Sequence, residues 1–94
     1  MTGRFTVPAG HPSLPGHFPG RPVVPGVVLL DAVFALAGAA RPTKLLRAKF
    51  AAPVEPGEEV EVAFQERGTG GRLGFTCRCR GAVVLTGEFE AAPA

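Results

Sequence analysis

The side chains best suited to proton transfer lie in the first third of the chain. His17 and Asp31 are fourteen residues apart, and Asp31 is the only aspartate in the sequence. An imidazole is the group best matched to proton transfer near neutral pH. A carboxyl group in apolar surroundings holds its proton, which raises its pKa and lets it act as an acid near neutrality. We therefore predict a base at His17 and an acid at Asp31.

The residues between these two supply a third chemical element. Pro25 and Gly26 open a long apolar run, as is typical of the start of a helix. The free backbone N–H groups of Gly26 and Val27, at the positive end of the helix dipole, can polarise a carbonyl oxygen. Glycine also lets a ligand approach the backbone closely. We group Gly26 and Val27, with Phe18 and Pro25 beside them, as candidate oxyanion and substrate-binding residues.

A base, an acid and an oxyanion site are the parts needed to remove a proton next to a carbonyl group and expel a β-hydroxyl. Each part also has a plain structural interpretation. Asp31 could reach solvent or cap a neighbour, His17 could make a structural hydrogen bond, and Gly26 could serve only as a turn residue. The other histidine, His11, fits a loop-bracing role better than a catalytic one. The only serine, Ser13, has no nucleophile elbow around it, and the spacing of the candidate ligands predicts no metal site.

Two elements must position these groups. Six of the ten prolines fall in residues 8–25, so this segment can form neither a regular helix nor a central strand. Because prolines fix the backbone every few residues and Phe18, Val23 and Val24 offer apolar anchors, we expect an ordered loop. Residues 26–40 then predict a helix that is apolar on every face, and such a helix is buried in a core or between subunits.

The rest of the chain reads as strands. Short strands are expected at residues 4–7, 43–54, 58–65, 73–80 and 82–91, with a turn at 67–72. Alternation places Val60, Val62 and Phe64 inward on one strand, then Leu73, Phe75, Cys77 and Cys79, and finally Val83, Leu85 and Phe89. We predict an α+β fold over residues 1–94, in which an antiparallel sheet wraps around one central buried α-helix. Phe34, Leu36 and Phe50 are candidates to line a tunnel.

Composition narrows the class of protein. A net charge of +2 with dispersed basic residues argues against nucleic-acid binding, and 46% hydrophobic residues exceed what a disordered chain carries. The apolar run is too short and interrupted for a membrane span, and no leader pattern is present, so a cytoplasmic location is expected. The spacing of Cys77 and Cys79 predicts two reduced thiols on one face of a strand. A chain of 94 residues with this much apolar surface favours an oligomer, because it can bury part of that surface between subunits.

One segment carries a family resemblance. Residues 17–27 read HFPGRPVVPGV, with the acid Asp31 following four residues later. This closely resembles the signature of the 3-hydroxyacyl-[acyl-carrier-protein] dehydratases, a family with the hot-dog fold. The chain is shorter than the housekeeping enzymes and looks more like the small stand-alone dehydratase-like proteins of specialised lipid or polyene pathways.

The resemblance implies a mechanism and a set of partners. His17 would take the proton next to the thioester carbonyl, Asp31 would protonate the leaving hydroxyl, and the Gly26 N–H would hold the thioester oxygen. Family active sites form at a dimer interface, so a homodimer or higher homo-oligomer with shared sites is expected. The acyl chain arrives on the phosphopantetheine arm of an acidic acyl carrier protein, and no cofactor is required.

Two points stay open at this stage. The most widespread branch of the family carries Glu where this chain has Asp31, whereas a related dehydratase/isomerase branch carries Asp. The type of acid therefore does not decide whether isomerisation also occurs. A hot-dog acyl thioesterase and a non-catalytic acyl-binding or subunit-pairing module are the alternative functions.

Overall fold

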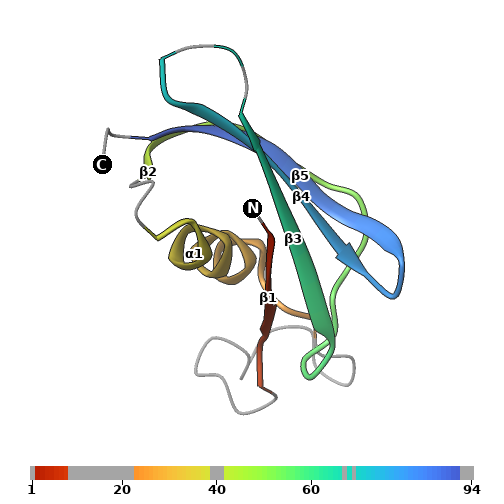
Figure 1. Cartoon of the computed structure of the whole chain (residues 1–94). Helices are drawn as coiled ribbons and strands as arrows, with labels where there is room; N and C mark the ends of the chain where they lie inside the picture. The colour runs from red at the N-terminus through yellow and green to blue at the C-terminus, as the bar shows by residue number, and fades with distance from the viewer. Residues whose placement is uncertain (1, 9–22, 39–41, 67, 69, 92–94) are drawn as a thin grey trace.

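The protein is described by a computed structural model that covers residues 2–8, 23–38, 42–66, 68 and 70–91. Its elements follow the order β1, α1, β2, β3, β4 and β5 along the chain. They are β1 (Thr2–Thr6), α1 (Gly26–Ala37), β2 (Pro42–Phe50), β3 (Glu59–Glu66), β4 (Arg72–Cys79) and β5 (Ala82–Ala91). The five strands form one antiparallel sheet in the order β1-β3-β4-β5-β2. The sheet curves, and α1 lies inside the curve (Figure 1). This arrangement confirms the predicted hot-dog architecture.

The core lies between α1 and the concave face of the sheet. Helix residues Val28, Leu29, Val33 and Ala37 are buried against inward-facing residues of β3, β4 and β5. Phe89 stands at the centre, with the rings of Phe34, Phe64 and Phe75 around it at centroid distances of 5.5, 6.4 and 6.0 Å. Burial of these apolar side chains is the main force that holds the helix on the sheet.

The predicted strand faces are largely confirmed. Val60, Val62 and Phe64 of β3 point inward, as do Phe75, Cys77 and Cys79 of β4. The exception is Val83 of β5, which we expected inward but which is 37% exposed. The register of β4 and β5 shifts between Cys77 and Arg78. Because a shift of one residue turns side chains to the opposite face, Val84 is buried in place of Val83.

The turns explain where the strands end. Arg80 and Gly81 both have positive φ, at 53° and 78°, and join paired residues Cys79 and Ala82. A two-residue hairpin of this kind matches the twist of the strands that it connects. β2 ends at Phe50 and not at the predicted Val54, because the chain bends at Ala52 before Pro53.

The helix differs from its prediction in two ways. It ends at Ala37, followed by Gly38 with φ 55°, whereas the prediction extended it to residue 40. It is also not buried on every face within one chain. Val27, Asp31 and Ala35, spaced four residues apart, are exposed. A single sheet covers only one side of a helix, so the other side of α1 is left open.

Candidate active site

The start of α1 leaves backbone N–H groups without an acceptor inside the helix. Pro25 precedes the helix with extended backbone angles (φ −58°, ψ 145°), and its carbonyl accepts hydrogen bonds from the N–H groups of Val28 and Leu29 at 3.0 and 3.3 Å. Gly26 and Val27 precede Val28, the first residue whose N–H donates to Pro25. They belong to the first helical turn, where backbone N–H groups have no acceptor within the helix. They stand at the positive end of the helix dipole, as the sequence predicted.

Gly26 is needed for a reason that the sequence did not reveal. A Cβ atom at this position would lie 2.7 Å from Cζ and 2.9 Å from Cε1 of the Phe50 ring. The close approach therefore comes from a side chain of the same protein. Phe50 is 50% exposed, so the tip of its ring packs on the helix start while the rest of the side chain is partly open to solvent.

An apolar hollow of about 500 Å³ opens at this point. It is lined by the residues that lead into α1 and by the segment that follows β2, including Val23, Pro25, Gly26, Leu29, Phe50 and Pro53. The two segments are fastened together by a backbone hydrogen bond of 2.8 Å from Val24 N to Val54 O. An apolar hollow beside the start of a helix suits an acyl group attached to a polar carbonyl.

Asp31 lies elsewhere on the helix. It lines a separate hollow of about 300 Å³ between α1 and the end of β1, together with Phe5, Thr6, Val7, Pro8, Val28 and Ala32. The expected burial of its carboxyl group is not provided within one chain, since Asp31 is exposed. Five residues separate it from Gly26, which corresponds to a rotation of about 140° around the helix and an axial rise of about 7.5 Å. The carboxyl group and the helix start therefore face different sides of α1.

The remaining predicted residues divide into three groups. His11, His17 and Phe18 lie outside the described residues. Phe50 lines the apolar hollow as predicted. Phe34 and Leu36 do not: Phe34 packs against Phe89 in the core, and Leu36 lies within 3.1 Å of where a Cβ on Gly3 would stand. The sequence did not predict that Pro53 would line the first hollow or that the Thr6–Pro8 segment would line the second. These residues are far from the helix in the sequence, and only the fold brings them beside it.

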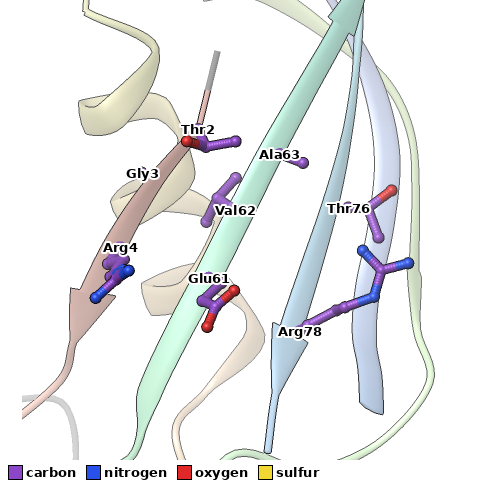
Figure 2. A pocket seen from close by; sticks show the side chains of 8 residues that line it. All are labelled: Thr2, Gly3, Arg4, Glu61, Val62, Ala63, Thr76 and Arg78. Carbon is purple, nitrogen blue, oxygen red and sulfur yellow. The ribbon is translucent and has the colours of Figure 1, made fainter. Parts of the chain in front are cut away.

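A third hollow, of about 300 Å³, lies on the outer face of the sheet (Figure 2). Arg4, Glu61 and Arg78 come from the neighbouring strands β1, β3 and β4 and place alternating charges along it. The sheet separates it from the start of α1. Its mixed charges and distance from the helix N–H groups give it none of the chemistry predicted above.

The two cysteines are buried and unreactive. Burial raises the pKa of the Cys77 thiol to about 12. The pKa of Cys79 is also raised, first by burial and then by the nearby Glu58 carboxylate. Thiols act as nucleophiles only when deprotonated, so neither thiol suits covalent catalysis. Within the described ranges, no group of three or more histidine, cysteine or acidic side chains could hold a metal ion.

Curated relatives support the chemistry that this geometry suggests. The chain is 33% identical over 104 residues to the 3-hydroxyacyl-[acyl-carrier-protein] dehydratase FabZ of Rhizobium rhizogenes, covering 95% of this chain and 66% of the relative. It is 33% identical over 107 residues to the FabZ of Klebsiella pneumoniae, covering 92% of this chain and 68% of the relative. The chain thus spans about two thirds of the length of these relatives.

Solved structures share the fold. The dehydratase heterocomplex ApeI:P from Xenorhabdus doucetiae superimposes with a TM-score of 0.79 at 20% identity, covering 95% of this chain and 83% of that one. An uncharacterised protein from Erwinia carotovora gives a TM-score of 0.78 at 22% identity, covering 98% of this chain and 82% of the other. No helix among the described residues is long and apolar enough to cross a membrane. The family model for ApeI-like dehydratases matches residues 1–88, and this chain belongs to that family.

Proposed function

We propose that this protein dehydrates a 3-hydroxyacyl thioester, carried by an acyl carrier protein, to the trans-2-enoyl thioester in fatty-acid or polyene synthesis. The observation that carries the proposal is the apolar hollow that Pro25 and Gly26 line at the start of α1. The family and its FabZ relatives support the same reaction. The substrate arrives on phosphopantetheine, and the reaction as proposed uses no cofactor. A cytoplasmic location stays a prediction.

In the proposed reaction, His17 removes a proton from the carbon next to the thioester carbonyl. The electrons of that C–H bond form the new double bond as the C–O bond to the β-hydroxyl breaks. Asp31 gives its proton to the departing oxygen, which leaves as water. The Gly26 N–H, with Val27 beside it, stabilises the negative charge that develops on the thioester oxygen. Phe18, Pro25 and Phe50 would hold the acyl group next to these atoms.

We further propose that a complete site needs two subunits, in the simplest case a homodimer. In one chain, Asp31 is exposed and faces a different side of α1 from the hollow at Gly26. A second subunit packed on the open side of the helix would bury Asp31 and bring it near the His17 loop of the other chain. The structural neighbour ApeI:P from Xenorhabdus doucetiae is described as a dehydratase heterocomplex, which supports a site made by more than one chain.

Enoyl-thioester absorbance with a 3-hydroxyacyl-pantetheine substrate tests the reaction. The wild type should produce the signal, and His17→Ala and Asp31→Asn should each abolish it. Release of free thiol by the wild type instead would identify a thioesterase and contradict the proposal. A shift of the new double bond to the 3,4 position would show that isomerisation follows dehydration.

Mixing the two inactive variants tests the shared site. If His17 and Asp31 act across the interface, a mixed dimer of His17→Ala and Asp31→Asn chains contains one intact site, and activity should return. If both groups act within one chain, every site in the mixture lacks one of them and the mixture stays inactive. Doubly substituted chains mixed with either single variant serve as the control, because they can restore no site.

A further inference from the structure

The turn that precedes β3 holds both ends of the segment that carries His17. Gly57 N–H donates a hydrogen bond of 2.8 Å to the carbonyl of Val7, just before this segment begins. Val24 N–H, just after the segment ends, donates to the carbonyl of Val54 at 2.8 Å. All three valines are buried, so water has little access to either bond. The turn therefore fixes where the His17 segment begins and where it ends.

The conformation of this turn follows from its sequence. Glu58 N–H donates to the carbonyl of Glu55 at 3.3 Å, and Pro56 and Gly57 stand between them. Gly57 has φ 88°, and proline followed by a glycine in the left-handed region is the pattern of a type II turn. Glu58 closes the same turn a second time, because its Oε1 accepts a hydrogen bond from Glu55 N–H at 2.8 Å. The Glu58 carboxylate is thus part of the turn.

The other carboxylate oxygen of Glu58 fastens the turn to a distant part of the sheet. Oε2 lies 3.0 Å from Nη1 of Arg80, in the hairpin that joins β4 to β5. The Cys79 thiol donates a hydrogen bond to the same carboxylate. The Glu58 side chain is only 17% exposed, so these contacts replace most of its hydration. The pair of Arg4 with Glu59, by contrast, is 3.8 Å long and exposed on both sides.

We propose that Glu58 is a positioning residue for His17. Its carboxylate holds the turn against the β4–β5 hairpin, and the turn holds both ends of the segment that carries the base. Glu58 lines neither the hollow at Gly26 nor the hollow at Asp31, so it acts through the backbone and does not touch the substrate. Displacement of a catalytic group by about 1 Å can cost about 10²-fold in rate. The inference rests on the proposed function, because it needs His17 as the base.

A turn that served only to stabilise the fold would have different contacts. It would pack on the core, and its loss would lower the free energy of unfolding without changing the rate of the protein that remains folded. Here the two backbone bonds go to Val7 and Val24, at the borders of one segment. A network with this connectivity couples the Glu58 carboxylate to the placement of that segment.

The first test needs no substrate. Glu58→Ala removes both the acceptor for Glu55 N–H and the partner of Arg80. We expect the backbone amides of Val24 and Gly57 to exchange with solvent about tenfold faster, measured by nuclear magnetic resonance, whereas the amides of β4 keep their rates. Glu59→Ala is the matched control: it removes the same charge one position away, from a side chain on the outer face, and should leave all of these rates unchanged.

The second test measures the reaction. In Glu58→Ala, kcat for dehydration should fall about tenfold, because the base is displaced. The dissociation constant of an acyl-pantetheine that lacks the β-hydroxyl should stay within about twofold of the wild type, because Gly26, Leu29 and Phe50 still line the hollow. Glu59→Ala should retain the wild-type kcat.

Arg80→Asn separates positioning from stability. Arg80 has φ 53° and precedes Gly81, and asparagine followed by glycine suits a hairpin of this kind well. The unfolding midpoint should therefore not fall, yet kcat should drop about threefold because the guanidinium no longer holds Glu58. This variant also decides the question if Glu58→Ala does not fold.

The outcomes can be told apart. Unchanged exchange at Val24 and Gly57 in Glu58→Ala would overturn the proposal. So would faster exchange with an unchanged kcat, or weaker acyl binding with an unchanged kcat. A wild type that does not dehydrate its substrate would overturn the proposed function, whereas an active wild type with equally active Glu58→Ala and Arg80→Asn variants would overturn only the role of Glu58.

Discussion

The two sides of α1 are made of similar residues but have different surroundings. Toward the sheet, Val33 is fully buried, with Val28, Leu29 and Ala37 close behind. On the other side, Val27 is 68% exposed, and Asp31 and Ala35 are exposed with it. The sheet-facing side holds the fold together, whereas the open side carries the only aspartate of the chain and is the side that we propose a second subunit covers. The comparison teaches that the hydrophobic character of a residue on this helix does not by itself decide whether that residue is buried in the core of its own chain.

The largest expected effect is chemical and lies on the open side. Asp31→Asn keeps the shape of the side chain but removes the acid, so we expect dehydration to fall about 10²- to 10⁴-fold. The unfolding midpoint of dilute, dissociated protein should stay within error of the wild type, because Asp31 is exposed in the single chain. Single-turnover rates and thermal denaturation check the two parts. Full activity in Asp31→Asn would remove this residue from the mechanism.

A matched pair of valines tests the comparison most directly. Val33→Ala should lower the free energy of unfolding by about 2 kcal/mol, since it removes buried methyl groups and leaves a cavity. Val27→Ala should change it by no more than about 0.5 kcal/mol. Urea denaturation of dilute protein measures both values. Equal losses from the two substitutions would mean that the open side of α1 is already covered in the free subunit.

A substitution at Gly26 tests whether the packing of Phe50 on the helix start matters for stability or for activity. In Gly26→Ala, the new Cβ meets the tip of the Phe50 ring. The ring is half exposed and can move, so we expect a loss of only about 1 kcal/mol in stability but a larger loss of activity. Adding Phe50→Leu should recover the stability. A Gly26→Ala protein as active as the wild type would show that the ring does not have to lie where it does.

The smallest effect concerns the sheet beneath the buried side. Burial raises the pKa of Cys77 to about 12 in the folded protein, above its ordinary value. The folded state therefore holds this proton more tightly than the unfolded chain does. Its contribution to stability is complete below the pKa of the unfolded chain, about 8.5, and declines as pH rises toward 12. Denaturation with and without Cys77→Ser across this range measures the difference; native Cys77 should also resist iodoacetamide until the protein unfolds.

The sequence by itself determined most of the fold. Proline at residue 25, the long apolar run and the alternating strands led to one helix and an antiparallel sheet, and the inward residues of β3 and β4 were correct. These features follow from the spacing of apolar residues and from turn chemistry, which depend only on residues close together in the sequence. The HFPGRPVVPGV segment likewise identified the family.

Only the tertiary structure decided the features that depend on distant segments. The shift between β4 and β5 exposed Val83, because register is set by a neighbouring strand. The packing of Phe50 on Gly26 joins residues that are 24 positions apart. The exposure of Asp31 came as a correction, because an apolar helix does not reveal how many of its sides a single sheet can cover. Burial depends on the surfaces that meet, and here one of those surfaces belongs to a second subunit in our proposal.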